Sequence, residues 1–241
     1  MAGKQKTVIV TGASQGIGAG VAEAFLGRGY NVVANSRNIR KAGPFVETES
    51  LALVDGDIGE SAVASKIVET AVQKFGSIDA LINNAGVFIP KAFTEYTSED
   101  LDTLVSTTLA GFLYVTQLAV KQMLRQKSGS IVNVSTTLVD QPIAGVGASV
   151  QIMVKGALNA ATRALAIEYA KEGIRVNTVA LGVINTPMHK PETHEFLKGL
   201  HPVGRIGEIK EVVEAILFLT DATFTTGEIL HVDGGAHAGK W

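Results

Sequence analysis

The stretch TVIVTGASQGIG (residues 7–18) joins a run of apolar, β-branched residues to a glycine-rich turn. Its opening residues predict a buried strand, and GIGAGVAEAFLGRG (16–29) is typical of the helix that follows. Gly12, Gly16 and Gly18 allow a tight turn and a close approach to a ligand, and free N–H groups at a helix start favour an anion. This order predicts the phosphate-binding end of an α/β fold, and the alternative is a structural turn without a ligand.

The rest of the chain repeats the alternation of short apolar runs and longer helical patterns. We expect further strands at NVVAN (31–35), LALVDGD (51–57), DALINNAG (79–86), GSIVNVS (129–135), IRVNTVA (174–180) and GEILHVDGG (227–235). We expect helices over 60–76, from about Ser98 to Gln126, over about 149–172 and near 209–220. Continuous apolar strands that alternate with helices predict a parallel sheet covered on both faces, and therefore a doubly wound α/β fold.

The composition excludes several classes of function. The 241 residues are 46% hydrophobic and carry a formal net charge of -2. That content supports a sizeable core, and the absence of a Lys/Arg cluster argues against a nucleic-acid or anionic-membrane partner. The chain has no cysteine, which excludes disulfide and thiolate chemistry. No set of His, Asp and Glu has convincing metal-ligand spacing, so we expect no metal.

The apolar runs also bear on localisation. The run from Val8 to Val10 is too short for the core of a signal peptide. We expect no stretch that approaches the roughly 18 apolar residues of a membrane span. A soluble cytoplasmic protein is therefore the default expectation.

Several motifs, taken in order, resemble those of a known family. They are TGASQGIG (11–18), NNAG (83–86), Lys155 on its helix, GVINTP (182–187) and TGEILHVDGG (226–235). Together they resemble the classical short-chain dehydrogenase/reductase family, and the likeness runs nearly end to end. The resemblance implies one Rossmann-type domain over 1–241, a three-layer sandwich with a seven-stranded parallel sheet. It also implies a nicotinamide cofactor, a small-molecule substrate and a homo-oligomer, often a dimer or tetramer.

The resemblance further implies where the cofactor would bind. The residues expected at the pyrophosphate are Gly12, Ser14, Gln15, Gly16, Ile17 and Gly18. Those expected at the adenine are Asp57 and Ile58, and those expected beside the ribose are Asn84, Ala85 and Gly86. Those expected around the nicotinamide are Gly182, Ile184 and Thr186. The family's usual Pro-Gly is Leu181-Gly182 here, so the glycine is kept.

The end of the second strand bears on the choice between NADP and NAD. An acidic residue there would bind the ribose 2′-hydroxyl and select NAD, but none occurs between Asn31 and Arg40. Arg37 stands there instead, with the Ser36 hydroxyl beside it, and a guanidinium suits a phosphate. We therefore predict NADP(H) over NAD. Arg37 as a solvated surface residue is the alternative, and Gln15 stands where many NADP-preferring relatives carry a second basic residue.

The stretch GASVQIMVKGALNAATRALA (147–166) contains the least expected substitution. Gln151 and Lys155 are i and i+4, so both project from one helix face. In the family these positions hold Tyr, which transfers the substrate proton, and Lys, which lowers the pKa of that Tyr and binds the nicotinamide ribose. A glutamine amide has no proton to transfer near neutral pH. Lys155 is expected to bind the ribose; the alternative is a stem that packs while the head reaches water.

Two further catalytic positions of the family are also altered. The end of the strand IVNVST assigns the family's Ser to Thr136, with Ser135 and Thr137 as alternatives. Counting back the usual 13 residues from the glutamine gives Leu138, so this assignment implies two extra residues in the following loop. The family's Asn falls near Thr108. Of Asn, Ser, Tyr and Lys, only Lys is clearly kept.

An irregular segment near the C-terminal third offers other proton donors. Residues 185–205 hold three histidines, His189, His194 and His201, and we expect a substrate lid there. Histidine titrates near neutral pH, although each is more simply explained as a surface-loop residue. Asp140, just after the fifth strand, is another candidate, or it caps a turn.

Three functions fit these observations. The first is an NADP(H)-dependent oxidoreductase that acts on a carbonyl or alcohol, with Gln151 in place of Tyr. The second is a non-catalytic dinucleotide-binding protein, either a redox sensor or an oligomer partner. The third is a reductase of another bond, such as an activated C=C. We favour the first because the cofactor motifs are strong, and a fold alone does not fix a function.

Overall fold

The computed structural model describes residues 5–239, which form a seven-stranded sheet. Its strands are β1 (Thr7–Thr11), β2 (Asn31–Ser36), β3 (Leu51–Asp55), β4 (Ala80–Asn83), β5 (Gly129–Thr136), β6 (Ile174–Leu181) and β7 (Ile229–Val232). All neighbouring strands are parallel, in the order β3-β2-β1-β4-β5-β6-β7. The predicted parallel α/β sheet is confirmed.

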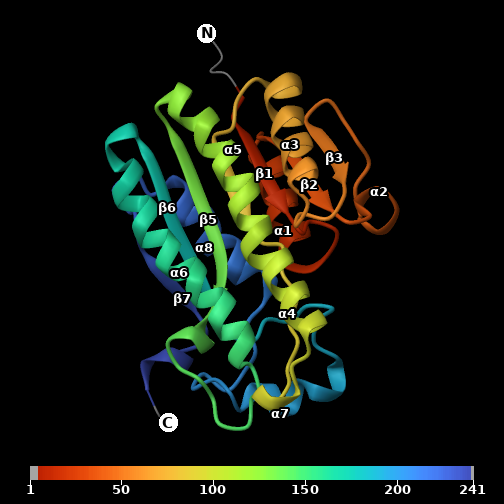
Figure 1. Cartoon of the computed structure of the whole chain (residues 1–241), viewed down its shortest axis with the longest axis vertical. Coiled ribbons are helices and arrows are strands. Elements are labelled where there is room, and N and C mark those ends of the chain that lie inside the picture. Colours follow the sequence, from red (N-terminus) through yellow and green to blue (C-terminus); the bar gives the residue numbers. More distant parts are fainter. Residues whose placement is uncertain (1–4, 240–241) are drawn as a thin grey trace.

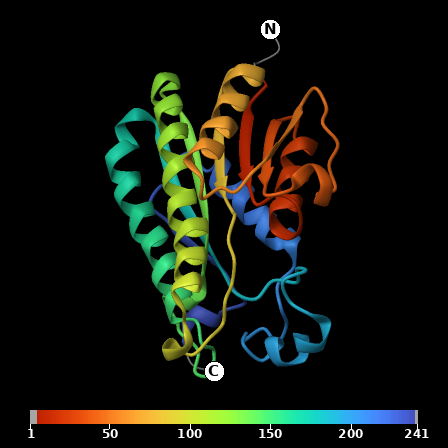
Figure 2. The same cartoon turned by 45° about the vertical axis from the view of Figure 1, so that its right-hand side comes forward.

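Helices cover both faces of the sheet and complete three layers (Figures 1 and 2). The helices are α1 (Gly16–Gly27), α2 (Ile39–Ala42), α3 (Ser61–Thr70), α4 (Ser98–Leu104), α5 (Gly111–Gln126), α6 (Ser149–Tyr169), α7 (His194–Lys198) and α8 (Ile209–Asp221). Short π-helical and 3₁₀ segments are η1 (Ala71–Phe75), η2 (Phe93–Glu95), η3 (Val105–Ala110), η4 (Thr137–Val139), η5 (Ala170–Glu172), η6 (Pro191–Thr193) and η7 (Ala236–Ala238). Helices α3, α5 and α6 lie on one face, and α1 and α8 lie on the other.

The strand order fixes where a ligand can lie. The chain proceeds outward from β1 through β2 to β3, then returns to place β4 on the other side of β1. The connections after β1 and β4 therefore part in opposite directions at the carboxyl ends of these strands. In open parallel sheets this switch point forms a crevice that binds ligands. The glycine-rich turn after β1 lies at this crevice.

Two hydrophobic cores, one on each face, explain the apolar strands. Val8 and Val10 of β1 pack with α1 and α8, whereas Ile9 between them packs with α3 and α5. A strand buried on both faces has no solvent side, so apolar residues occupy successive positions. Each such side chain contributes about 1.5–3 kcal/mol to the free energy of unfolding when it is fully buried.

The helical run Ser98–Gln126 corrects one expectation. It contains an 18-residue window of mean hydropathy 1.4, so by length and composition it would suffice for a membrane span, although we expected no such stretch. In the fold, Val115, Ala119 and Met123 of this run pack into the core with α3. We therefore interpret it as a core helix of the sandwich, whose apolar content serves burial against the sheet.

Several predicted strands end earlier in the structure, for reasons of backbone geometry. The strand predicted over 51–57 ends at Asp55, because Gly56 turns the chain at a φ of 143°. The strand predicted over 227–235 occupies only Ile229–Val232, because Gly234 and Gly235 also have positive φ. Part of the N-terminal stretch considered for a signal peptide, residues 1–4, lies outside the described residues.

Candidate functional site

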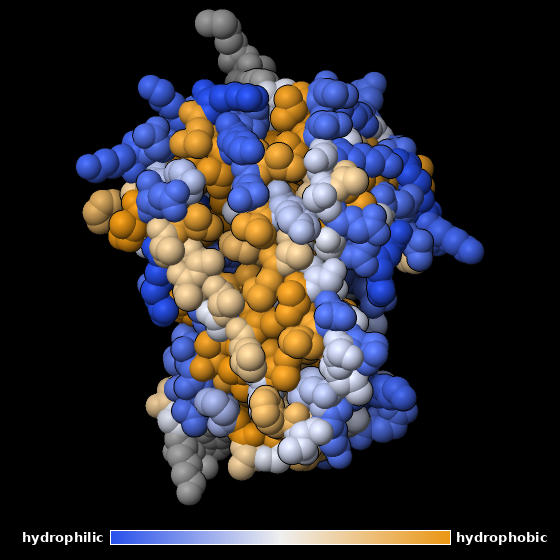
Figure 3. Space-filling view, viewed as in Figure 1, coloured by the Kyte–Doolittle hydropathy of each residue, from blue (hydrophilic) through white to orange (hydrophobic). Residues whose placement is uncertain are grey.

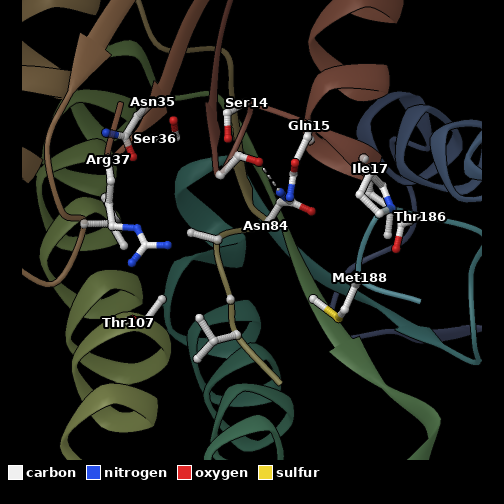
Figure 4. Close-up of a pocket in the computed structure, with 18 of the residues that line it drawn as sticks. Ser14, Gln15, Ile17, Asn35, Ser36, Arg37, Asn84, Thr107, Thr186 and Met188 are labelled. Carbon is white, nitrogen blue, oxygen red and sulfur yellow. Dashed lines mark hydrogen bonds between the residues drawn. The ribbon is translucent and has the colours of Figure 1, made fainter. Parts of the chain in front are cut away.

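A cleft at the switch point gathers most of the residues predicted to bind a cofactor (Figure 4). The predicted residues that line it are Gly12, Ser14, Gln15, Gly16, Ile17, Gly18, Ser36, Arg37, Asp57, Ile58, Asn84, Ala85, Gly86 and Thr186. They come from the turns after β1 to β4 and the segment after β6. Figure 4 shows Arg37 at one side of the cleft and Thr186 with Met188 at the other, with Ser14, Gln15 and Asn84 between them.

The glycine turn has a backbone that other residues would not adopt easily. Gly12 and Gly16 have φ values of 67° and 58°, in the left-handed region that favours glycine. Gly18 has a different requirement, which is space. A Cβ on Gly18 would lie 2.3 Å from the Gly12 carbonyl oxygen and 2.5 Å from Nδ2 of Asn84. At its three glycines the turn therefore presents backbone to the cleft with no side chain between.

Hydrogen bonds from the end of β4 hold this turn. Nδ2 of Asn84 donates to the carbonyl oxygens of Thr11 at 2.9 Å and Gly12 at 3.1 Å. The Thr11 hydroxyl accepts from the backbone N–H groups of Asn84 and Ala85, each at 3.1 Å. The Asn84 amide thus links the end of β4 to the end of β1. This bonding also explains why the strand predicted over 79–86 ends at Asn83.

The Arg37 end of the cleft holds an unpaired guanidinium. Arg37 is exposed, lines the cleft and forms no ion pair with any described residue. Nearby, Nδ2 of Asn35 donates to the carbonyl oxygens of Val54 and Gly56, so that amide fastens β2 to β3. Oδ1 of Asp57 accepts from the Gly59 N–H at 2.9 Å. The Arg37 guanidinium therefore lies at the edge of the cleft, beside backbone that these hydrogen bonds hold in place.

Lys155 lies next to Gly86, which lines the cleft. Its residue surface is 7% exposed, and its Nζ donates to the Val134 carbonyl oxygen at 2.7 Å. A Cβ on Gly86 would lie 3.4 Å from that Nζ. Burial lowers the pKa of Lys155 to about 8, because removal from water disfavours the charged form. The alternative in which its head reaches water is wrong.

The other predicted catalytic positions differ in their hydrogen bonding. Gln151 is 3% exposed, and its Oε1 has no hydrogen-bond partner among the described residues. Oγ1 of Thr108, in η3, is buried and equally unpartnered within that part of the chain. The Thr136 hydroxyl, half-buried, donates to the Leu181 carbonyl oxygen at 3.3 Å. Buried polar groups without partners are uncommon, and among the described residues Ser130 and Asn159 also have them.

The two alternatives to Thr136 are occupied by structural bonds. The Ser135 hydroxyl donates to the Lys155 carbonyl oxygen at 3.4 Å, and Ser135 is buried. The Thr137 hydroxyl donates to Oδ2 of Asp233 at 2.6 Å, inside the fold. Of the three residues, Thr136 is therefore the one whose side chain keeps some exposure.

Comparisons with known proteins agree with this arrangement. Residues 12–237 match the family described as enoyl-(acyl carrier protein) reductase. The 3-oxoacyl-(acyl-carrier-protein) reductase of Bos taurus is 36% identical over 233 residues, covering 95% of this chain and 97% of that protein. The 3-oxoacyl-(acyl-carrier-protein) reductase FabG of Thermotoga maritima is 34% identical over 244 residues, covering 95% and 97%.

This chain belongs to the classical short-chain dehydrogenase/reductase family. Solved structures share its fold. ElxO with NADP bound has a TM-score of 0.89 at 29% identity, covering 98% of this chain and 100% of that one. The 3-ketoacyl-(acyl-carrier-protein) reductase of Brucella melitensis, complexed with NADH, has a TM-score of 0.87 at 29% identity, covering 96% and 98%. The chain is thus an oxidoreductase of the short-chain dehydrogenase/reductase type.

Five predicted site residues do not line the cleft, namely Gly182, Ile184, Lys155, Gln151 and Thr136. Ile184 is buried in the core, next to Gly207. Gly182 lies against a histidine, since a Cβ there would be 2.6 Å from Nε2 of His201. Sequence reasoning also missed lining residues, which are Asn35, Gly56, Val87, Thr107, Pro187 and Met188. They lie next to predicted residues in the sequence, and that proximity is the signal that could have identified them.

The alternative proton donors are mostly engaged elsewhere in this short-chain dehydrogenase/reductase. Nε2 of His201 accepts from the Val183 N–H at 2.9 Å, and its Nδ1 lies 3.1 Å from the Leu197 carbonyl oxygen, so the ring is neutral and bonded on both sides. His201 is also buried, contrary to the surface-loop interpretation. Oδ2 of Asp140 lies 3.0 Å from Nε2 of His231.

Two histidines of the segment expected to form a lid remain closer to the surface. Nε2 of His194 lies 3.3 Å from the carbonyl oxygen of His189. Burial, and then the neighbouring His194, lowers the pKa of His189. His189 is therefore the one lid histidine with no hydrogen bond from its ring to another described residue.

Proposed function

We propose that the chain is an NADP(H)-dependent oxidoreductase that interconverts a carbonyl and an alcohol on a small molecule. The observation that supports it most is the glycine turn, which leaves its backbone bare at a helix start within the cleft. Free N–H groups there suit a pyrophosphate. When bound, the nicotinamide would supply or accept the hydride. The names of the similar ketoacyl reductases favour a carbonyl as the reacting group.

The preference for NADP(H) rests on Arg37 and Ser36. An unpaired guanidinium and a neighbouring hydroxyl at the end of β2 offer charge-assisted hydrogen bonds to a 2′-phosphate. No carboxylate stands in this strand end to bind a 2′-hydroxyl instead. The similar structures hold NADP in one case and NADH in the other, so the preference rests on this chain's own residues.

At the reacting end we propose that Gln151 occupies the position of the family's Tyr, with Thr136 in that of the Ser. Lys155 would bind the nicotinamide ribose, because it lies behind Gly86 in the cleft wall. Gln151 can hydrogen-bond a substrate oxygen, but an amide cannot protonate it near neutral pH. Residues 185–205 would close over the substrate, since Thr186, Pro187 and Met188 already line the cleft.

A second function is favoured by the same glutamine. A dinucleotide-binding protein without turnover, either a redox sensor or an oligomer partner, needs the cofactor cleft but no proton donor. Loss of a general acid typically lowers a rate by about 10²–10⁴-fold, which would suffice to silence the site. Gln151 is the observation that favours this candidate.

We also propose a homo-oligomer, a dimer or tetramer, built through the helical face that carries α5 and α6. Figure 3 shows an apolar band over this face. Its exposed apolar side chains include Leu113, Met153 and Ile167, the last 82% exposed. Exposed apolar patches of this kind mark interaction surfaces. A small-molecule substrate, a cytoplasmic location and no nucleic-acid or membrane partner remain part of the proposal.

Turnover assays on purified protein separate the two functions. NADPH consumption is measured against a panel of ketones, diketones and quinones, for the unmodified chain and for Gln151→Tyr. Turnover by the unmodified chain supports the oxidoreductase. Turnover by Gln151→Tyr alone, with NADPH bound by both proteins, supports the non-catalytic candidate. No binding of NADPH or NADH contradicts both.

A further inference from the structure

The Lys155 ammonium has protons that the fold does not use. An ammonium carries three N–H donors, and within the described chain that of Lys155 donates one hydrogen bond, to the Val134 carbonyl oxygen. Gly86, which lines the cleft, presents no side chain on the cleft side of Nζ. Lys155 itself does not line the cleft, so its remaining donors lie directly behind Gly86, where no side chain separates them from the cleft.

No nearby charge fixes the ammonium in its protonated form. The segments β5, η3 and η4, which pack on α6, contain no charged residue. On the other elements packed against α6, the charged residues are Arg175 in β6, Glu99, Asp100 and Asp102 in α4, and Lys171 and Glu172 in η5. None of them contributes to the lowered pKa of Lys155, which burial alone causes. Lys155 can therefore change its charge near neutral pH without breaking an ion pair.

The other proton carriers near the cleft are less suited. His201 is a neutral ring bonded to backbone on both sides, and Asp140 is paired with His231. The Tyr96 hydroxyl donates to the Ile89 carbonyl oxygen at 2.6 Å. His189 is the remaining competitor among these groups, and it lies in the proposed lid rather than on α6.

We propose that Lys155 is itself the general acid and base of this site, a role beyond binding the ribose. This inference rests on the proposed oxidoreductase function. In reduction, hydride adds to the carbonyl carbon, the C=O π electrons move to oxygen, and that oxygen takes a proton from Nζ. Lys155 becomes a neutral amine and regains its proton from water. In oxidation the neutral amine takes the hydroxyl proton as hydride leaves the carbon.

The two directions have opposite pH dependence under this proposal. Reduction needs the protonated ammonium, so its rate falls as pH rises through the pKa of Lys155. Oxidation needs the neutral amine, so its rate rises through the same range. A Lys that only binds the ribose would shift cofactor affinity with pH but would not reverse its effect between the two directions.

The test combines a direct titration with kinetics. The pKa of Lys155 is measured by NMR on protein with ¹³C-labelled lysine, with the signal assigned by its loss in Lys155→Met. Rates of NADPH consumption and NADP reduction are then followed between pH 6 and pH 10, a range that spans the pKa of about 8. Lys155→Arg keeps a positive charge but gives up no proton, because a guanidinium stays protonated throughout this pH range. His189→Asn is the matched control for the competing donor.

We expect Lys155 to titrate near the pH at which the rates are half-maximal. Across that pH the reduction rate should fall and the oxidation rate should rise. Lys155→Arg should still bind NADPH by calorimetry yet lose about 10²–10⁴-fold in turnover, the usual effect of a lost general acid. Because His189 lies in the proposed lid, His189→Asn should lose much less turnover than Lys155→Arg and should keep the pH dependence of both directions. If Lys155 stays protonated through pH 10 while turnover persists, the proposal is overturned and the oxidoreductase function stands. If His189→Asn abolishes turnover, the proton donor is His189. If the unmodified chain binds NADPH without turnover, both the function and this inference fail.

Discussion

The phosphate end of the cleft and the catalytic positions beside the cleft, here called the reacting end, differ in how far the folded chain satisfies its own polar groups. At the phosphate end, Asn84 and Thr11 form a closed set of hydrogen bonds around the glycine turn. At the reacting end, Gln151 Oε1 and Thr108 Oγ1 are buried without a partner among residues 5–239. An unsatisfied buried group costs about 1–3 kcal/mol. The first end is therefore complete before any ligand arrives, whereas the second retains groups that suit a ligand or water.

This difference indicates which features of the site tolerate a change of residue. The phosphate end depends on backbone shape, which tolerates few replacements. The reacting end depends on proton transfer, and the residue at position 151 can change without disturbing the turn. A chain can thus keep its cofactor site while its proton chemistry moves to another group.

The largest effect is expected from Gly18→Ala, which tests whether the phosphate end depends on backbone shape. The new Cβ would lie 2.3 Å from the Gly12 carbonyl oxygen, so the turn must shift. We expect loss of measurable NADPH binding and a decrease of about 1–3 kcal/mol in the free energy of unfolding, typical of overpacking. Calorimetry and urea unfolding measure the two effects.

The control for that variant is Gly27→Ala in the same helix. A Cβ on Gly27 would meet no atom within 4 Å. We expect unchanged NADPH affinity and a gain of about 0.4–1 kcal/mol in stability, because alanine restricts the unfolded chain. Equal NADPH affinity for the two alanine variants would show that the turn does not hold a pyrophosphate.

A smaller effect is expected from Arg37→Ala, which separates the 2′-phosphate from the rest of the cleft. A hydrogen bond to a charged group contributes about 1.5–3 kcal/mol, so the Kd for NADPH should rise about 10–100-fold. The Kd for NADH should not change. Arg40→Ala is the control, because Arg40 is already paired with Glu47 and Asp55. A parallel loss of both cofactors in Arg37→Ala would contradict the assignment.

The smallest effect concerns how the stability of the fold depends on pH, and it tests the role of His201 in the fold. Burial lowers the pKa of His201 below its ordinary value. As pH falls below about 6.5, the unfolded chain binds a proton there that the folded chain does not, so stability decreases. His189 acts in the same direction. Thermal unfolding between pH 7.5 and pH 5.5 should show a falling Tm, by about 2–4 °C for each kcal/mol lost.

The variant His201→Asn tests this explanation. It should have a lower Tm at pH 7.5, since the bond to the Val183 N–H is altered, but a smaller further fall toward pH 5.5. The pKa of Glu211, lowered to about 2 by its hydrogen bond with Arg205, affects stability only at more acid pH. An undiminished fall in His201→Asn would assign the effect to other groups.

Much of the fold was predictable, because hydrophobic periodicity and turn residues act locally. The strand cores and the helix from Ser98 to Gln126 are confirmed, and a capping box of Thr97 and Asp100 starts that helix. The π-helical segment η3 inside that helix was not predicted, because single-residue shifts in helical hydrogen bonding leave no clear pattern. Strand ends also differed, since positive-φ glycines such as Gly56 set them.

The candidate site was predictable where motifs determine backbone position. The glycine turn and the residues after β2, β3 and β4 do line one cleft. Sequence could not decide between a buried and a solvated Lys155, because the carbonyl that holds it belongs to Val134, on a strand 21 residues earlier. The burial of Ile184 in the core also depends on tertiary packing, through Gly207 and α8.

Calorimetric titration of the unmodified protein with NADPH and then with NADH tests directly whether the phosphate end is a complete dinucleotide site with a 2′-phosphate partner at Arg37. We predict binding of both cofactors, with a Kd for NADPH at least tenfold lower, as one charge-assisted hydrogen bond of about 1.4 kcal/mol or more would give. Equal affinities would remove the role of Arg37, and failure to bind either cofactor would contradict the account of the cleft.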